Sequence, residues 1–266
     1  MKALLVLCIL WTFHPSPAKA AECVNIFYDR SEDASYWMGR AYAIFLQNLL
    51  GHFPQLQQIV SPIELYRKGD TEKCRATFYL GSYFSSRIPQ AFLEDYASTK
   101  VPVAWFGYSV WKLGDDLEKI FGYRFEKITQ LNREKLDEKG RPTFFKWIDY
   151  KGETFFKYGE WNKDHIFLAQ FEQVQLAKTM DGRAQVLAEA RDDSNSERIP
   201  YALRSGNHFY IADIPFSFIH EADRYLITAD LLFDILNIPP RNEHLALVRV
   251  EDVHAMIPLY SLLGIT

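Results

Sequence analysis

The sequence lacks an excess of positive charge. It has 30 Lys and Arg residues against 34 Asp and Glu residues, which gives a formal net charge of -4. A nucleic-acid-binding domain normally carries a basic patch and an alkaline isoelectric point, so the charge balance gives no support for a nucleic-acid partner. Hydrophobic residues make up 48% of the chain and aromatic residues 15%, which is enough for a folded core and argues against disorder.

Several motifs that position catalytic or binding groups are also missing. The chain has no Gly-x-Ser-x-Gly, no phosphate-binding Gly-x-x-x-x-Gly-Lys, no dinucleotide-binding Gly-x-Gly-x-x-Gly and no Cys-x-x-Cys. No two of its seven histidines are four residues apart, so no helix presents a histidine pair to a metal. These absences leave the corresponding hydrolase, nucleotide-binding and redox classes without support.

The N-terminus has the three parts of a secretory signal peptide. Lys2 is followed by the apolar residues 3–13, and Ala18-Lys19-Ala20 forms a small-x-small cleavage site. The apolar stretch is short for a bilayer span, although an uncleaved anchor is the alternative, and no later segment looks transmembrane. We therefore predict an exported protein that is periplasmic, bound to the cell envelope or extracellular. Loss of residues 1–20 leaves 28 basic and 34 acidic residues, a charge of -6.

Cysteine is scarce, and two of the three cysteines remain in the chain after the predicted signal peptide is removed. Cys23 and Cys74 each stand just before a strand-like run. Neighbouring parallel strands bring their starts close together, and an even pair of cysteines in an oxidising compartment normally pairs. We predict a disulfide between them, the alternative being two free thiols.

Residues 21–122 predict an open, mostly parallel α/β sheet, flavodoxin-like or amidotransferase-like in outline. Strand-like runs cover residues 24–28, 76–81 and 101–107, with a further run near 59–66 that Pro62 interrupts. Stretches of helical periodicity cover residues 36–53, 90–96 and 111–121.

Residues 123–218 predict a β-rich module inserted into this fold. Turn residues indicate hairpins at Lys151-Gly152, at Asp181-Gly182 and at residues 205–207. Residues 219–243 return to helix and provide a linker. Residues 244–266 open a further domain with an apolar strand-like run.

That last run ends in Glu251, Asp252 and His254. Of two adjacent carboxylates, one can ligate a divalent metal while the other takes a proton from metal-bound water. Glu251 and Asp252 are therefore candidates for these two roles, and His254 could be a further ligand or a substrate contact. The alternative is an ordinary acidic pair at a strand end.

A second candidate site lies where the predicted parallel strands end. Asp29 follows the first strand, Gly81 ends the third, and Gly107 and Tyr108 close the fourth. Open α/β sheets bind ligands at the carboxyl ends of their strands, so these residues are candidate binding residues. Helix capping and plain strand-to-helix turns are the alternative.

Three segments resemble the DUF2334 family of secreted, polysaccharide-deacetylase-like bacterial proteins. They are residues 78–93, 100–111 and 247–253. The last resembles the first catalytic motif of the family, Arg-x-Glu-Asp-Val, at the start of a deformed (β/α) barrel. The resemblance implies a divalent metal, most often zinc, on Asp252, with Glu251 as the base. It also implies deacetylation of a cell-envelope polysaccharide.

The family pattern continues beyond this motif with a His-x-x-x-His metal pair that the sequence lacks. A catalytic zinc site needs about three protein ligands. The resemblance therefore implies a truncated deacetylase domain that binds no metal stably and is inactive as given. Whether the chain is an enzyme stays open. The alternative is a non-catalytic α/β module of the cell envelope that binds carbohydrate or a partner.

Overall fold

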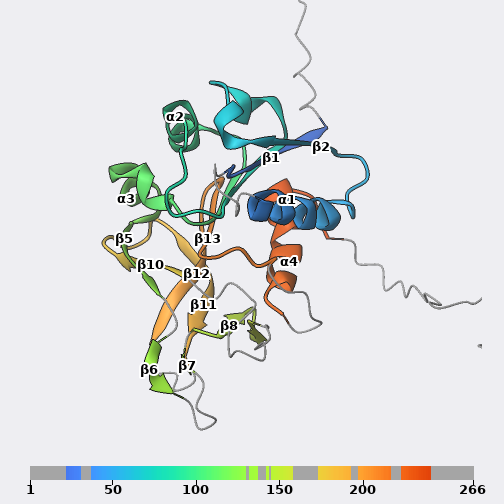
Figure 1. Cartoon of the computed structure of the whole chain (residues 1–266). Coiled ribbons are helices and arrows are strands. Elements are labelled where there is room, and N and C mark those ends of the chain that lie inside the picture. The colour runs from blue at the N-terminus through green and yellow to red at the C-terminus, as the bar shows by residue number, and fades with distance from the viewer. Residues whose placement is uncertain are drawn as a thin grey trace, which may run out of the picture.

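The computed structural model describes residues 22–30, 37–129, 132–136, 142–143, 145–157, 173–192, 197–216 and 223–240. Within these ranges the main element is a nine-stranded sheet of order β2-β1-β3-β4-β13-β12-β11-β8-β9 (Figure 1). One half of this sheet is parallel and the other antiparallel, and the candidate site lies on the parallel half.

The parallel half has the strand order of a flavodoxin-like fold. Its strands are β1 (Cys23–Tyr28), β2 (Gln57–Pro62), β3 (Ala76–Gly81), β4 (Val103–Gly107) and β13 (His208–Ile211). β1 pairs with β2 and β3, β3 with β4, and β4 with β13, each in parallel. With β13 as the fifth strand, the order is 2-1-3-4-5. The predicted α/β class with an open, mostly parallel sheet is confirmed.

The antiparallel half is built from the β-rich part of the chain. Its strands are β8 (Trp147–Tyr150), β9 (Glu153–Phe156), β11 (Gln185–Arg191) and β12 (Arg198–Ser205). The predicted hairpin at Lys151-Gly152 joins β8 to β9, with both turn residues at positive φ. The hairpin predicted at residues 205–207 joins β12 to β13. These four strands thus extend the main sheet.

The hairpin predicted at Asp181-Gly182 is wrong. β10 (Gln173–Lys178) pairs with β5 (Tyr123–Thr129), whereas β11 pairs with β8 and β12. The chain does turn at Gly182, which has a φ of 72°, but Val174 and Leu176 of β10 are buried under the sheet. Residues 173–176 are buried on both faces of the strand, so tertiary packing and not the adjacent turn decides the partner of β10. A third pair joins β6 (Asn132–Leu136) to β7 (Pro142–Thr143).

Two local expectations also need correction. Residues 63–65 form the 3-10 helix η1 (Ile63–Leu65) instead of a strand, because Pro62 ends β2 and cannot donate to a ladder. The helix expected over residues 111–121 is split at Gly114, which has a φ of 56°, into η3 (Val110–Leu113) and α3 (Asp115–Phe121). A further 3-10 turn, η2 (Asp70–Lys73), precedes β3.

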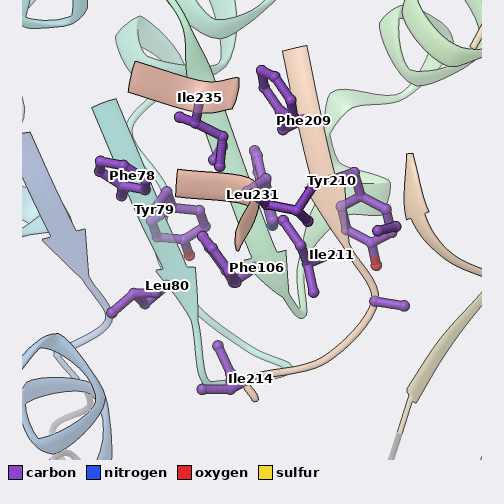
Figure 2. Close-up of a cluster of buried hydrophobic side chains, with 14 of the residues drawn as sticks. Phe78, Tyr79, Leu80, Phe106, Phe209, Tyr210, Ile211, Ile214, Leu231 and Ile235 are labelled. Carbon is purple, nitrogen blue, oxygen red and sulfur yellow. The ribbon is translucent and has the colours of Figure 1, made fainter. Parts of the chain in front are cut away.

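Helices cover both faces of the parallel half. α1 (Trp37–Leu50) and α4 (Tyr225–Leu236) share one face, where Phe53, just after α1, packs edge-to-face against Phe233 with ring centroids 5.1 Å apart. Figure 2 shows Leu231 and Ile235 of α4 among the buried side chains of β3, β4 and β13. The opposite face holds α3 and α2 (Gln90–Ser98). This division follows from right-handed crossovers whose direction reverses after β2. No helix in the described ranges is long and apolar enough to cross a membrane.

The predicted disulfide is present. Cys23 opens β1 and Cys74 stands just before β3, and the two sulfurs are bonded. β1 and β3 are direct neighbours, so their starts lie side by side as the sequence predicts. The bridge closes a loop over a sequence separation of 51 residues, which restricts the unfolded chain.

Candidate functional site

The carboxyl ends of β1, β3, β4 and β13 lie along one edge of the sheet. From β1 the chain first crosses to β2 on one side and then to β3 on the other. The gap between β1 and β3 is therefore the topological switch point, where open α/β sheets bind ligands. Asp29 and Ser82, the residues after these two strands, stand at this position.

Asp29 lies in the predicted crevice, but its carboxylate is bound by its own chain. The side chain is 2% exposed. It accepts hydrogen bonds from the Tyr79 hydroxyl at 2.5 Å, the Tyr83 backbone N–H at 2.9 Å and the Ser86 hydroxyl at 2.5 Å. Burial raises the pKa of Asp29 to about 6, against the hydrogen bonds from Ser86 and Tyr79, which lower it. Asp29 is therefore mainly ionised at neutral pH and holds the loop that follows β3.

The two glycines of the candidate site are required by close backbone packing. A Cβ on Gly81 would lie 2.2 Å from the Tyr108 carbonyl oxygen, and a Cβ on Gly107 would lie 2.7 Å from the Gly81 oxygen. The Tyr108 N–H donates to the Gly81 oxygen at 2.7 Å. The ring of Tyr108 is 7% exposed, and its carbonyl accepts from the Trp105 indole at 2.8 Å. The three residues thus join the ends of β3 and β4.

An aromatic surface lies beside this edge. We use that name for Phe84, in the loop after β3, Trp111 of η3 and Phe125 of β5. The Phe84 and Trp111 ring centroids are 4.9 Å apart, and those of Trp111 and Phe125 are 4.8 Å apart. Trp111 and Phe125 are partly buried against the core, whereas Phe84 is 58% exposed. Sequence reasoning missed Phe84, although a large apolar residue in the polar loop 82–87 was a usable signal.

A buried ionic centre occupies the same edge further along, beyond β13. It consists of Lys157, Asp213, Asp223 and Arg224, whose side chains are at most 1% exposed. Asp213 accepts from Arg224 at 2.9 Å, from Lys157 at 3.0 Å and from the Tyr201 hydroxyl at 2.6 Å. Burial lowers the pKa of Lys157 to about 8, against Asp213, which raises it. No sequence pattern predicts this centre, because its members come from three separate segments of the chain.

A polar hollow of about 510 Å³ lies at the other end of the sheet. Its lining residues are Asp149, Gly152, Glu153, Thr154, Arg191 and Arg198. Asp149 pairs with Arg191 at 2.9 Å and Arg198 at 3.0 Å, and it accepts from Thr154 at 2.7 Å. The side chains of this hollow mainly satisfy one another.

The proposed deacetylase residues Glu251, Asp252 and His254 lie outside the described residues. Within the described part of the chain, no group of three or more His, Cys, Asp or Glu side chains is placed to hold a metal ion. The metal and base assignments therefore stay predictions.

No protein-family model matches the chain, and no curated protein matches it. Among solved structures, a ThuA-like protein from Bacteroides uniformis is similar at 12% identity and a TM-score of 0.49. The match covers 82% of this chain and 93% of that one. An exo-beta-1,4-mannosidase from Opitutaceae bacterium strain TAV5 is similar at 10% identity and a TM-score of 0.46, over 81% of this chain and 34% of the mannosidase. Such distant likenesses assign no activity, and the DUF2334 resemblance stays a prediction.

Proposed function

We propose that the chain is an exported, carbohydrate-binding α/β module of the cell envelope. The observation that carries the proposal is Phe84, a residue 58% exposed whose ring packs at an angle of 40° against Trp111 at the carboxyl edge of the sheet. Burial of apolar surface stabilises a protein by about 25 cal/mol for each Å², and an exposed ring does not gain this free energy. The C–H face of a sugar ring would cover that surface, and aromatic rings are common in such sites.

The position of the aromatic surface distinguishes it from an ordinary exposed apolar patch. Phe84 follows β3 and Trp111 follows β4, so both rings stand at ligand-binding ends of parallel strands. The predicted signal peptide and the disulfide between Cys23 and Cys74 agree with a protein that works outside the cytoplasm. A glycan of the cell envelope is the partner that this location and this chemistry favour.

The test is binding of the chain, without its predicted signal peptide, to insoluble peptidoglycan, chitin, xylan and mannan in a sedimentation assay. Soluble oligosaccharides of each glycan that binds are then titrated by calorimetry. Phe84→Ala should weaken binding about tenfold, which corresponds to about 1.4 kcal/mol, a typical cost for a well-placed aromatic contact.

The matched control is Ile44→Ala. Ile44 is 49% exposed and lies on α1, on the other face of the sheet from α2 and α3. This variant should bind as the wild type does. Failure of the wild type to bind any of the glycans, or equal losses in the two variants, would contradict the proposal.

Metal-dependent deacetylation is the second candidate, and the observation that favours it is the motif around Glu251 and Asp252. Asp252 would hold a divalent metal, most often zinc, and Glu251 would act as the base in the complete family pattern. In a version extended to the full barrel, Asp252→Asn should sharply reduce bound metal and turnover, measured by elemental analysis and acetate release. Unchanged turnover would end this assignment.

A further inference from the structure

The loop that presents Phe84 is fixed by hydrogen bonds on both of its sides. We call residues 82–86 the switch-point loop. On the β1 side, the Asp29 carboxylate accepts from the Tyr83 N–H at 2.9 Å and from the Ser86 hydroxyl at 2.5 Å. These two donors bracket Phe84 in the sequence. The backbone before and after the exposed ring is therefore tied to a single buried group.

The β4 side of the loop is held independently. The Ser109 hydroxyl donates to the Tyr83 carbonyl at 2.9 Å and to the Phe84 carbonyl at 3.4 Å, and Lys112 donates to the Ser86 carbonyl. Ser109 is fully buried with a φ of 67°, a left-handed conformation that persists in a non-glycine residue only when its surroundings enforce it. Both neighbouring strands thus contribute groups that fix the loop.

The start of α1 closes the third side. A Cβ on Gly39 would lie 2.3 Å from the Asp29 carbonyl oxygen and 3.0 Å from the Ser82 hydroxyl. Because α1 approaches this closely, Asp29 and the first residue of the loop have little room to move. The Asp29 side chain is therefore directed at the loop and is enclosed by its own chain.

We infer that Asp29 is a positioning residue, which holds the switch-point loop so that the Phe84 ring is presented beside Trp111 in one geometry. This inference rests on the proposed glycan-binding function of the aromatic surface. A ring that is already fixed loses less conformational freedom when a ligand binds. Asp29 therefore acts on binding through Tyr83 and Ser86 without touching the ligand.

Asp95 provides a control in a different loop. Its carboxylate is buried and accepts from the Tyr66 hydroxyl at 2.5 Å and from the Gly69 N–H at 2.6 Å. Like Asp29, it binds one tyrosine hydroxyl and one loop N–H, but it serves the loop that precedes η2. Asp95 also pairs with Lys68 at 2.9 Å, an ion pair that Asp29 lacks. Asp29→Asn and Asp95→Asn therefore each weaken the hydrogen bonds from a tyrosine hydroxyl and a loop N–H, in two different loops, and Asp95→Asn also removes an ion pair.

The experiment is amide hydrogen exchange on the chain without its signal peptide, combined with glycan titration. Asp29→Asn should speed exchange at Tyr83 about tenfold or more, because one of its two oxygens becomes a donor. Asp95→Asn should speed exchange at Gly69 and leave Tyr83 unchanged. Glycan affinity should fall several-fold in Asp29→Asn, and adding this change to Phe84→Ala should cost little more, as expected for coupled residues.

Unchanged exchange at Tyr83 in Asp29→Asn would overturn the inference, as would full additivity with Phe84→Ala. If the wild type binds no glycan, the proposed function fails, and the exchange rates alone decide whether Asp29 fixes the loop. If Asp29→Asn does not fold, Ser86→Ala takes its place, since it removes one donor and keeps the carboxylate. It should speed exchange within the loop, and unchanged exchange in it would also overturn the inference.

Discussion

Two buried carboxylates on the same edge of the sheet respond to burial in opposite ways. Asp29 and Asp213 are 2% and 1% exposed, and each follows a parallel strand. The donors to Asp29 are two hydroxyls and a backbone N–H, and its pKa is raised to about 6. Burial alone would raise the pKa of Asp213 too, but Arg224 and Lys157 hold it below its usual range. Neutral donors offset part of the cost of burying a charge, whereas cations reverse the direction of the shift.

The largest expected effect tests the cationic side of this comparison. Asp213→Asn leaves Lys157 and Arg224 buried with one carboxylate fewer, and removal of one partner from a buried ion pair costs about 3–5 kcal/mol. The free energy of unfolding in urea should fall by that amount. It should fall by clearly less in Asp29→Asn, because this change leaves no buried cation without its partner. A loss below about 1 kcal/mol in Asp213→Asn would show that the ionic centre contributes little.

A smaller effect tests the neutral side through pH. Because the folded pKa of Asp29 is about 6 and its ordinary value is 3.8, the folded chain takes up a proton between these values. The stabilising contribution of Asp29 is therefore complete below pH 4 and is lost as the pH rises through 6. About two pKa units correspond to about 3 kcal/mol. As the pH rises from 4 to 7, the difference between the unfolding free energies of the wild type and Asp29→Asn should fall by up to this amount.

Urea denaturation at pH steps between 4 and 7 measures this difference. Asp213 has the opposite sign, since its lowered pKa stabilises the fold above its ordinary pKa and the contribution is lost in acid. If the unfolding free energies of the wild type and Asp29→Asn change with pH in parallel across this range, the proposed difference between Asp29 and Asp213 is wrong.

The sequence was sufficient for elements whose side chains are buried on both faces. β3 and β4 consist entirely of buried residues, and continuous apolar runs predicted both strands. It also placed the cysteines correctly, because the starts of neighbouring parallel strands meet. The sequence did not predict the partner of β10, because the pairing of this strand depends on the surface that it covers and not on the turn beside it.

The candidate site was predictable in position but not in role. Strand ends marked Asp29, Gly81 and Gly107, yet the role of Asp29 depends on a side chain 50 residues away, that of Tyr79, and the two glycines are explained by backbone packing between the ends of β3 and β4. Phe84 stood in a loop that no periodicity describes. The ionic centre joins residues 157, 213 and 224, and a single sequence holds no local sign of such long-range pairing.

The place of β13 in the sheet has a consequence for how the chain folds. β4 is complete at Gly107, but its second neighbour, β13, begins only at His208. Until residues 108–211 have been made and packed, β4 is an unprotected edge strand of five apolar or small residues. Such an edge invites pairing with other chains, and contacts between distant segments form slowly. We therefore expect the assembly of this sheet to be the step at which the newly made chain is most prone to aggregate.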